Sequence, residues 1–316
     1  MLVQAIAGAV STATHGTGHA LGSLADQVVA LRMLLADGSA RDCAESDANP
    51  DFFHAARVSL GALGVISTLT LKIVPQFRLV RQQDFMHIDA LCERLPALLA
   101  EHARVEWFWE PYTTDASLLL RLPTDEPVDD PSKGGGCWRA DGVDLEEEDH
   151  SRAVDVSYKA LGREACYPDL YTEIEMFVPI EHAAAAFRDF RAFEKSVRKQ
   201  RDQRSELQCG CRYVAAERSW LSPMYGDSAQ AVFSFLVGGD EHATGSAEEF
   251  ALHAAGLEQV CLKYGGRPHW GKRFTRELYD FNVLYPRWAE FCALRHSVDP
   301  RGMFVNDWVE RVFSLK

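Results

Sequence analysis

The stretch 11–38 constrains the fold more than any other part of the chain, because closely spaced glycines come directly before an apolar run. The glycines follow the spacing Gly16-x-Gly18-x-x-x-Gly22, and the run at 27–36 is rich in valine and leucine. A dinucleotide-binding fingerprint has the spacing G-x-G-x-x-G and leads from a strand into a helix. Here the spacing is one residue longer and a strand follows, so the sequence excludes a nicotinamide-binding fold. Small and hydroxylated residues would still let the backbone approach a flat or phosphorylated ligand closely.

The rest of the chain predicts an α+β protein in two parts. In the first 77 residues, turn residues separate short β-branched runs from one short helix, and Pro75 closes the unit. From 78 to 272, apolar residues recur at helical spacing between longer strand-like runs, which suggests one sheet covered by helices on a single face. The predicted strands are 27–36, 39–43, 65–74, 105–109, 117–122, 172–178, 212–216 and 231–237, and the predicted helices are 49–56, 88–99, 187–197 and 246–260.

The composition limits the kinds of partner that we expect for this chain. The chain has 316 residues, with 33 basic and 46 acidic ones and a formal net charge of -13. This balance gives no electrostatic footprint for nucleic acid. No window reaches the roughly 18 consecutive apolar residues of a membrane helix, and the N-terminus lacks the basic region of a signal peptide. We therefore expect a cytoplasmic protein that acts on a small molecule.

The eight cysteines show no spacing typical of a zinc site, so no metal is expected. Most are interpreted as small buried residues in a reducing compartment. Cys209 and Cys211 form the only close pair, and alternation in a strand would point both thiols to one face, which leaves a weak redox alternative open. The segment 123–155 is acidic and rich in proline and glycine; a solvated loop is favoured, with an active-site lid as the minority interpretation.

Four separated blocks carry a resemblance to a known family. They are AGAVSTATHGTG at 7–18, SLGALGVISTLTLKIVPQF at 59–77, GGRPHWGK at 265–272 and LYPRWAEFCALRHSVDPRGMFVNDWVERVF at 284–313. In this order they resemble the sugar-1,4-lactone and alditol oxidases, which include L-gulonolactone oxidase and D-arabinono-lactone oxidase, within the vanillyl-alcohol-oxidase superfamily. The resemblance implies a partial VAO/PCMH-type FAD-binding domain at 1–77 with 273–316. It also implies a cap domain with an antiparallel sheet covered by helices at 78–272.

The resemblance further implies that FAD is the cofactor and that two loops lie along the flavin. Glycine permits the close approach that backbone N–H groups need to bond the edge of the ring. Taken without the resemblance, His15 would be interpreted as a structural loop histidine. The implied cofactor-binding residues are Thr14, His15, Gly16, Thr17, Gly18, Gly61, Gly64, Val65 and Ile66.

The same resemblance assigns the catalytic residues. Oxidation of a sugar hydroxyl needs cationic groups near the substrate oxygen and the flavin. In the family, a Glu-x-Arg on a cap strand and the lysine of H-W-x-K line the substrate pocket. These positions correspond here to Arg212 and Lys272, with His269 beside the lysine. Without the resemblance, Arg212 would be interpreted as a strand-edge ion-pair former and Lys272 as a solvated loop lysine.

Two departures from the family pattern lead to further expectations. The glutamate position two residues before Arg212 is occupied by Gly210, so the carboxylate would have to come from Glu206, Glu173 or Glu175, or the substrate differs, or catalysis is impaired. The chain also begins directly before the second half of the FAD-binding domain. A fragment, a wrongly assigned start site, a split gene and a natural truncation all stay open, and the 316 residues alone are expected to bind FAD poorly.

Three functions follow as hypotheses. The first is FAD-dependent oxidation of a sugar lactone or polyol with O2 as the acceptor. The second is an inactive or complementing subunit that binds a separate N-terminal half-domain. The third is a flavin dehydrogenase that uses an acceptor other than oxygen.

Overall fold

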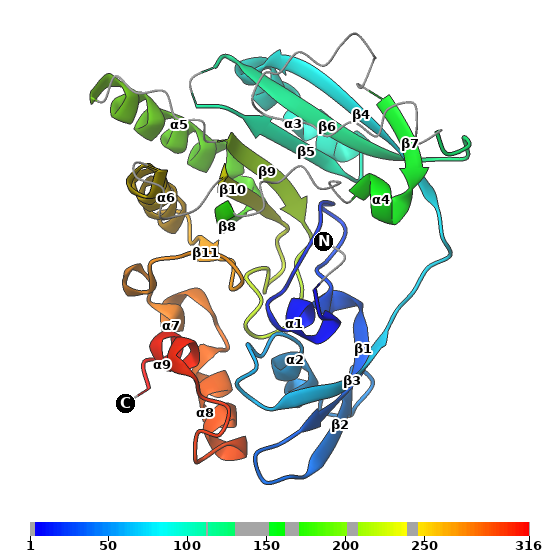
Figure 1. The fold of residues 1–316 in the computed structure, drawn as a ribbon, viewed down its shortest axis with the longest axis vertical. Helices are drawn as coiled ribbons and strands as arrows, with labels where there is room; N and C mark the ends of the chain where they lie inside the picture. Colours follow the sequence, from blue (N-terminus) through cyan, green and yellow to red (C-terminus); the bar gives the residue numbers. More distant parts are fainter. Residues whose placement is uncertain are drawn as a thin grey trace.

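The computed structural model describes residues 4–111, 113–129, 152–161, 171–200, 208–238 and 246–315. They form a small sheet unit near the N-terminus, a large sheet with its helices, and a C-terminal group of short helices, as Figure 1 shows. Most of the acidic segment at 123–155 lies outside these residues, so the solvated-loop and lid interpretations stay predictions.

The small sheet has the strand order β2-β1-β3 and is antiparallel throughout. The Asp37-Gly38 turn joins β1 to β2, and Gly38 takes a positive φ of 84° that suits a tight hairpin. Helix α2 packs on this sheet, and α1, which was not among the predicted helices, packs against α2 and η1. The elements are α1 (Ile6–Ser11), a 3-10 turn η1 (Ala25–Gln27), β1 (Val28–Leu34), β2 (Ala40–Ala44), α2 (Asp51–Arg57) and β3 (Val65–Leu71).

The large sheet contains eight antiparallel strands in the order β11-β8-β10-β9-β5-β6-β4-β7. Many strands that are neighbours in the sheet are not consecutive in the sequence. At the centre of the sheet, for example, β9 pairs with β5. Its strands are β4 (Arg78–His87), β5 (Val105–Trp109), β6 (Asp115–Thr124), β7 (Arg152–Val156), β8 (Tyr171–Pro179), β9 (Gln208–Val214), β10 (Gln230–Gly238) and β11 (Arg267–Pro268).

One face of the large sheet is apolar and covered by helices. Trp107 of β5 lies edge-on to Phe187, with ring centroids 4.8 Å apart, and Phe235 of β10 meets Phe190 at 5.1 Å. Both phenylalanine partners belong to the 18-residue helix α5. Three long helices pack against the sheet, in agreement with the predicted α+β architecture: α3 (Ile88–Glu101), α5 (Ala183–Gln200) and α6 (Ser246–Leu262).

The cysteines lie mostly in this covered core. The six described ones are free, and Cys209 and Cys211 of β9 are both fully buried. Burial raises the pKa of both thiols far above the ordinary value. A thiol that stays protonated is a poor nucleophile, so the structure gives no support to a redox role for this pair.

A cluster of aromatic side chains fixes the C-terminal segment. Trp270 donates to the carbonyl of Leu221 at 2.5 Å and lies at its centre. The short elements of this segment are η4 (Arg276–Leu278), α7 (Phe281–Leu284), α8 (Trp288–Val298) and α9 (Asp307–Phe313), which follow β11. Two other short elements lie elsewhere: α4 (Ser157–Leu161) packs against β4 and β7, and η3 (Ile180–His182) leads into α5. The rings packed around Trp270 are those of Phe274, Phe281, Tyr285, Trp288 and Trp308.

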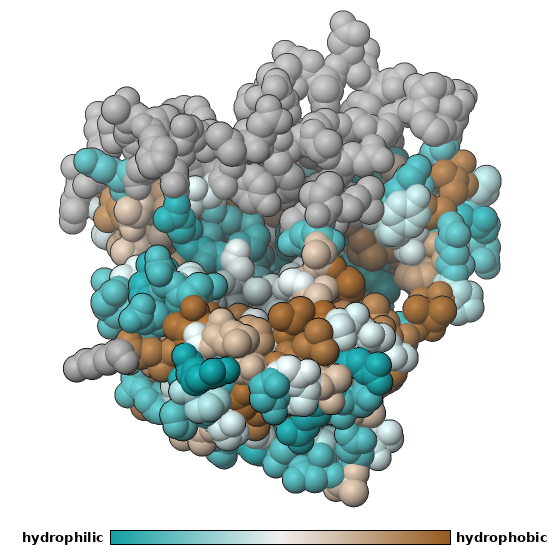
Figure 2. Space-filling view, turned by 60° about the horizontal axis from the view of Figure 1, so that its bottom comes forward, coloured by the Kyte–Doolittle hydropathy of each residue, from teal (hydrophilic) through white to brown (hydrophobic). Residues whose placement is uncertain are grey.

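The surface carries apolar groups outside this core. On the face shown in Figure 2, apolar residues gather across the middle of the molecule, with hydrophilic residues around them. Ile73 and Val74, directly after β3, are 89% and 72% exposed. In the described part of the chain no helix combines the length and hydropathy needed to cross a bilayer.

Candidate active site

The segment after β11 brings two predicted catalytic residues to the edge of the large sheet. It continues alongside β8: the backbone N–H of His269 donates to the carbonyl of Glu175 at 3.0 Å, and that of Arg273 to the carbonyl of Glu173 at 3.0 Å. The side chains of His269 and Lys272 are thereby set beside those of Glu175 and Glu173. Glu173 and Glu175 occupy alternate positions of one strand and therefore lie on one face of the sheet.

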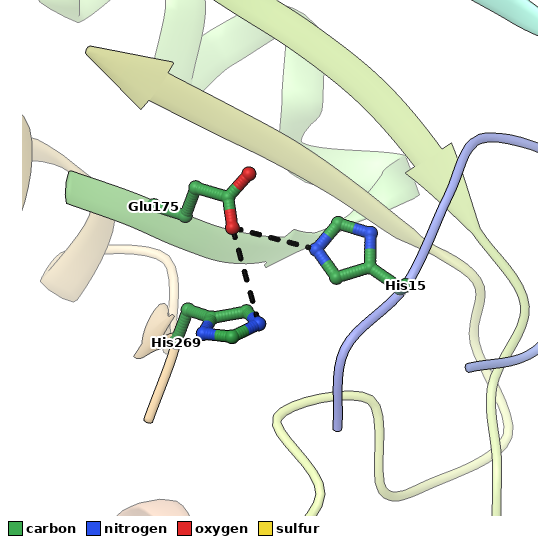
Figure 3. Close-up of side chains that lie close together, drawn as sticks. All are labelled: His15, Glu175 and His269. Atoms are coloured by element: carbon green, nitrogen blue, oxygen red, sulfur yellow. Dashed lines mark ion pairs between the residues drawn. The ribbon is translucent and has the colours of Figure 1, made fainter. Parts of the chain in front are cut away.

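Three side chains from distant parts of the chain meet on this face, as Figure 3 shows. The Nε2 of His15 lies 3.6 Å from Oε2 of Glu175, and the Nε2 of His269 lies 4.0 Å from the same oxygen. All three side chains are nearly completely buried. Burial and the nearby cations lower the pKa of His269 to about 3, despite the opposing charge of Glu175. His269 is therefore neutral at physiological pH.

Glu175 remains ionised although it is buried. Burial alone would raise the pKa of its carboxyl, but His15, Lys272 and His269 hold that pKa well below the ordinary value. A buried carboxylate of this kind is stable only because charged and polar partners surround it.

Arg212 is held between carboxylates of two different strands. Its Nε donates to Oε1 of Glu106 on β5 at 2.8 Å, and its Nη1 lies 3.6 Å from Oε1 of Glu175 on β8. Burial lowers the pKa of the guanidinium, but these carboxylates and Glu173 raise it further than burial lowers it. About a quarter of the side chain stays exposed, so a cation is presented on the sheet face.

Lys272 forms an ion pair with Glu173. Burial and the neighbouring charge of Glu175 raise the pKa of Glu173, and Lys272 opposes this shift only in part. Glu173 is therefore a carboxylate with an increased affinity for protons, placed beside the cation of Lys272 and within electrostatic reach of Arg212.

The position of Gly210 is already filled by neighbouring side chains. A Cβ atom added there would lie 2.8 Å from Oγ of Ser234 and 3.0 Å from Cε1 of Phe108. These residues lie directly opposite Gly210 on β10 and β5. Of the carboxylates considered as replacements, Glu173 and Glu175 lie at the site, whereas Glu206 falls outside the described residues. Glu106 was not foreseen, because a partner across the sheet leaves no signal in the local sequence.

The glycine-rich loop is fastened to the same strands that carry Arg212 and Glu106. Thr17 donates its hydroxyl to the carbonyl of Val105 at 2.7 Å, and the N–H of Gly18 donates to the carbonyl of Tyr213 at 2.5 Å. The loop at 59–64 is tied to the end of α1, three residues before Thr14, by a bond from the N–H of Leu60 to the carbonyl of Ser11 at 3.2 Å. The two predicted flavin loops therefore begin close to each other, although 40 or more residues separate them in the sequence.

These loops fit the expected flavin. The backbone N–H groups of His15, Gly16 and Thr17 donate to no acceptor within the described residues, and a Cβ atom on Gly16 would meet nothing within 4 Å. The hydroxyl of Ser59 is buried and has no hydrogen-bond partner among the residues that the structure describes. Free donors and open space beside the backbone suit a flat ring with carbonyl and nitrogen acceptors at its edge.

Three other residues predicted to bind the cofactor, Gly64, Val65 and Ile66, lie at the small sheet. Gly64 packs against β1, where a Cβ would lie 2.4 Å from the carbonyl oxygen of Leu34. Val65 and Ile66 belong to β3 and pair with Leu34 and Met33, and Val65 is 55% exposed. The structure does not bring these three residues to the His15–Glu175–His269 cluster.

Comparisons with known proteins agree with this architecture. The sequence profile of the D-arabinono-1,4-lactone oxidase family matches residues 137–312. The chain is 30% identical to L-gulono-1,4-lactone dehydrogenase of Mycobacterium tuberculosis, over 98% of this chain and 74% of that protein. It is 27% identical to L-gulonolactone oxidase of Mus musculus, over 98% of this chain and 73% of that protein.

A solved structure supports the fold alone. The chain superposes on a solvent-stable cholesterol oxidase with a TM-score of 0.72 and 15% identity, over 97% of this chain and 75% of that one. The ordered sequence blocks, the profile match and the identity to relatives over nearly the whole chain lead to one assignment. The chain belongs to the D-arabinono-1,4-lactone oxidase family, whose members are flavin oxidoreductases with FAD as their cofactor.

Proposed function

We propose that this protein oxidises a hydroxyl group of a sugar lactone or a polyol by transfer of a hydride to FAD. The observation that carries the proposal is the pairing of two cations, Arg212 and Lys272, with carboxylates on the sheet face beside the flavin loop. The relatives are named for L-gulonolactone, D-arabinono-lactone and alditol oxidation, which supports this substrate class.

The oxidation removes a hydride from the carbon and a proton from the hydroxyl group. FAD, held along the loop at 14–18, would supply the hydride acceptor for the carbon that carries the hydroxyl. Lys272 and Arg212 bind the substrate oxygen and stabilise the negative charge that develops there. Oε2 of Glu173 accepts the hydroxyl proton, a role for which its raised pKa and its position beside Lys272 suit it. The carbon–oxygen single bond becomes a carbonyl.

Lys272→Ala tests the proposal, with Lys263→Ala as the matched control. Lys263 is also a lysine in an ion pair, 3.5 Å from Asp189, but it lies on the surface with a 61% exposed side chain. We expect Lys272→Ala to lower kcat with L-gulono-1,4-lactone by on the order of 10²-fold, the scale of losing one charge-stabilising group. Flavin absorbance of the purified protein should change little. Equal turnover in both variants would remove Lys272 from the reaction.

The electron acceptor is proposed to be O2. The named relatives include both oxidases and a dehydrogenase, so an acceptor other than oxygen is the second candidate. Oxygen consumption measured in parallel with dye reduction separates them: turnover with dye alone would favour a dehydrogenase. We also propose that the protein acts in the cytoplasm.

A complementing subunit is the third candidate, favoured by the exposed apolar residues Val65, Ile73 and Val74 along and after β3. A separately expressed N-terminal half of an FAD-binding domain would then bind this chain and raise its flavin content. The visible absorbance spectrum after addition of FAD and gel filtration is the test. Full flavin content in the chain alone would argue against the need for a partner.

A further inference from the structure

The carboxylate of Glu106 binds a different arginine through each of its two oxygens. Oε1 accepts from Nε of Arg212 at 2.8 Å, and Oε2 accepts from Nη1 of Arg121 at 2.7 Å. Glu106 and Arg121 are almost completely buried, whereas about a quarter of the Arg212 side chain is exposed. Both distances are typical of charge-assisted hydrogen bonds, so the carboxylate is held from both sides.

The register of the large sheet places Arg121 on the same face as Arg212. Glu106 of β5 lies opposite Arg212 of β9 and opposite Leu119 of β6, and Arg121 is two residues beyond Leu119. Residues directly opposite each other in neighbouring strands share a face, and so do residues two positions apart in one strand. Arg121 therefore reaches Glu106 diagonally, on the face that carries the candidate active site.

A second hydrogen bond holds the guanidinium of Arg121 from its other side. Its Nε donates to the carbonyl oxygen of Ala160 at 3.0 Å. Ala160 belongs to α4, which packs against β4 and β7. Because Nε and Nη1 are both bonded and the side chain is buried, Arg121 is fixed in its position beside Glu106.

Two further arginines lie next to Arg121. Arg81 of β4 is directly opposite it, and the backbone N–H of Arg121 donates to the carbonyl of Arg104, directly before β5, at 3.3 Å. Burial lowers the pKa of Arg104, and the positive charge of Arg121 lowers it further, so these two guanidinium groups repel each other. Like charges on adjacent strands are destabilising, which adds to the preference of Arg121 for the Glu106 carboxylate.

The contact with Arg121 determines how Arg212 binds Glu106. An arginine and a carboxylate frequently form two parallel hydrogen bonds, one to each oxygen. Here Oε2 already accepts from Arg121, and a second bond to it would bring two guanidinium groups together. Arg212 binds Glu106 through Nε, its Nη1 lies 3.6 Å from Oε1 of Glu175, and its Nη2 makes no hydrogen bond within the described residues.

We propose that Arg121 is a positioning residue for Arg212: by binding Oε2 of Glu106, it limits Arg212 to one bond with that carboxylate and leaves Nη2 for the substrate. The inference rests on the proposed function, in which Arg212 binds the substrate oxygen and stabilises the negative charge that develops there. Arg121 acts through Glu106, since its own side chain is buried. Without Arg121, Arg212 forms the second bond to Glu106 and withdraws Nη2 from the substrate.

Crystal structures and kinetics of Arg121→Met test the proposal, with Arg104→Met as the matched control. Both changes remove a neighbouring guanidinium, but Arg121 binds Glu106 whereas Arg104 lies over the ring of Phe77. In Arg121→Met we expect a second bond from Arg212 to Glu106, and a kcat per bound flavin that is lower by on the order of 10²-fold with a smaller change in KM. Arg104→Met should match the wild type in both. Arg121→Lys keeps a cation for Oε2 and should recover most of kcat.

The number of bonds between Arg212 and Glu106 must change together with kcat. A folded Arg121→Met in which Arg212 keeps a single bond would overturn the inference, and so would two bonds at the wild-type kcat. If Arg121→Met does not fold, Arg121→Lys decides: a single bond with a kcat as low as that expected for Arg121→Met would contradict the proposal. Because the crystal structures need no turnover, a second bond in Arg121→Met of a protein that oxidises no lactone or polyol would contradict the proposed function alone.

Discussion

Arg212 and Glu106 lie on neighbouring strands, β9 and β5, and meet through a hydrogen bond of 2.8 Å from Nε to Oε1. The other oxygen of Glu106 accepts from Nη1 of Arg121 at 2.7 Å, so one buried carboxylate joins two arginines. This contact fixes the direction in which the guanidinium of Arg212 leaves the strand, and it leaves Nη1 to face Glu175.

Glu106→Gln should therefore affect stability and activity together. Removal of one charge from a buried ion pair leaves its partners uncompensated and typically costs about 3 to 5 kcal/mol. We expect a decrease of this order in the free energy of unfolding, measured with urea, and a lower kcat/KM. Glu126→Gln, which breaks the exposed pair with Arg152, is the control and should stay within about 1 kcal/mol of wild type. Equal effects of both changes would contradict a structural role for the buried carboxylate.

Gly210→Ala should destabilise the protein, because the added methyl group would lie 2.8 Å from Oγ of Ser234. Overpacking of this kind costs about 1 to 3 kcal/mol. The double variant Gly210→Ala/Ser234→Ala removes that oxygen and should recover part of the loss in thermal unfolding. Gly8→Ala, where a Cβ would meet nothing within 4 Å, is the control without a clash; because Gly8 lies inside α1, this variant should be at least as stable as wild type. A double variant no more stable than Gly210→Ala alone would show that Ser234 does not restrict this position.

A comparison of β5 with β4 shows which strands could be predicted from the sequence. β5 was predicted with its observed bounds, because its valine and aromatic residues strongly favour a strand. β4 was missed, since Arg78–His87 is mostly polar and owes its structure to pairing with β6 on one side and β7 on the other. The division into two domains stays a prediction.

The candidate site, too, was predicted only where local motifs mark it. The chain segments that carry His15, His269, Arg212 and Lys272 were identified from local motifs. The contacts that give these residues their chemistry depend on the registers of β8, β9 and β5, which set Glu173, Glu175 and Glu106 around them. Register is a property of paired strands, so local patterns named Glu173 and Glu175 only as candidates and did not point to Glu106.

His269 should make the protein less stable in acid. Its pKa in the folded state is lowered to about 3, whereas an unfolded histidine titrates near its model value of 6.5. Between these values the unfolded chain binds more protons, so the free energy of unfolding falls as the pH falls from about 6.5 to about 3. At pH 5 the loss from this residue is about 2 kcal/mol. The difference between the urea midpoints at pH 7.5 and pH 5.0 should become smaller in His269→Gln. In His296→Gln, the exposed control, it should stay as in wild type. An equal pH dependence of the midpoint in both variants would mean that other groups cause the loss of stability in acid.

Gly16 offers the sharpest test of where the flavin lies. Its surroundings are open, so Gly16→Ala adds a methyl group without a clash in the protein and should leave the unfolding temperature unchanged. A flat ring that approaches the backbone at this position would meet the methyl group directly, and its binding should weaken by roughly 1 to 3 kcal/mol, or about 5- to 150-fold in Kd. FAD titration followed by flavin fluorescence measures this change. Gly8→Ala has equally open surroundings but lies in α1, before the predicted flavin-binding residues 14–18, so it should bind FAD as wild type does. Unchanged affinity in Gly16→Ala would move the flavin away from the backbone N–H groups of His15, Gly16 and Thr17.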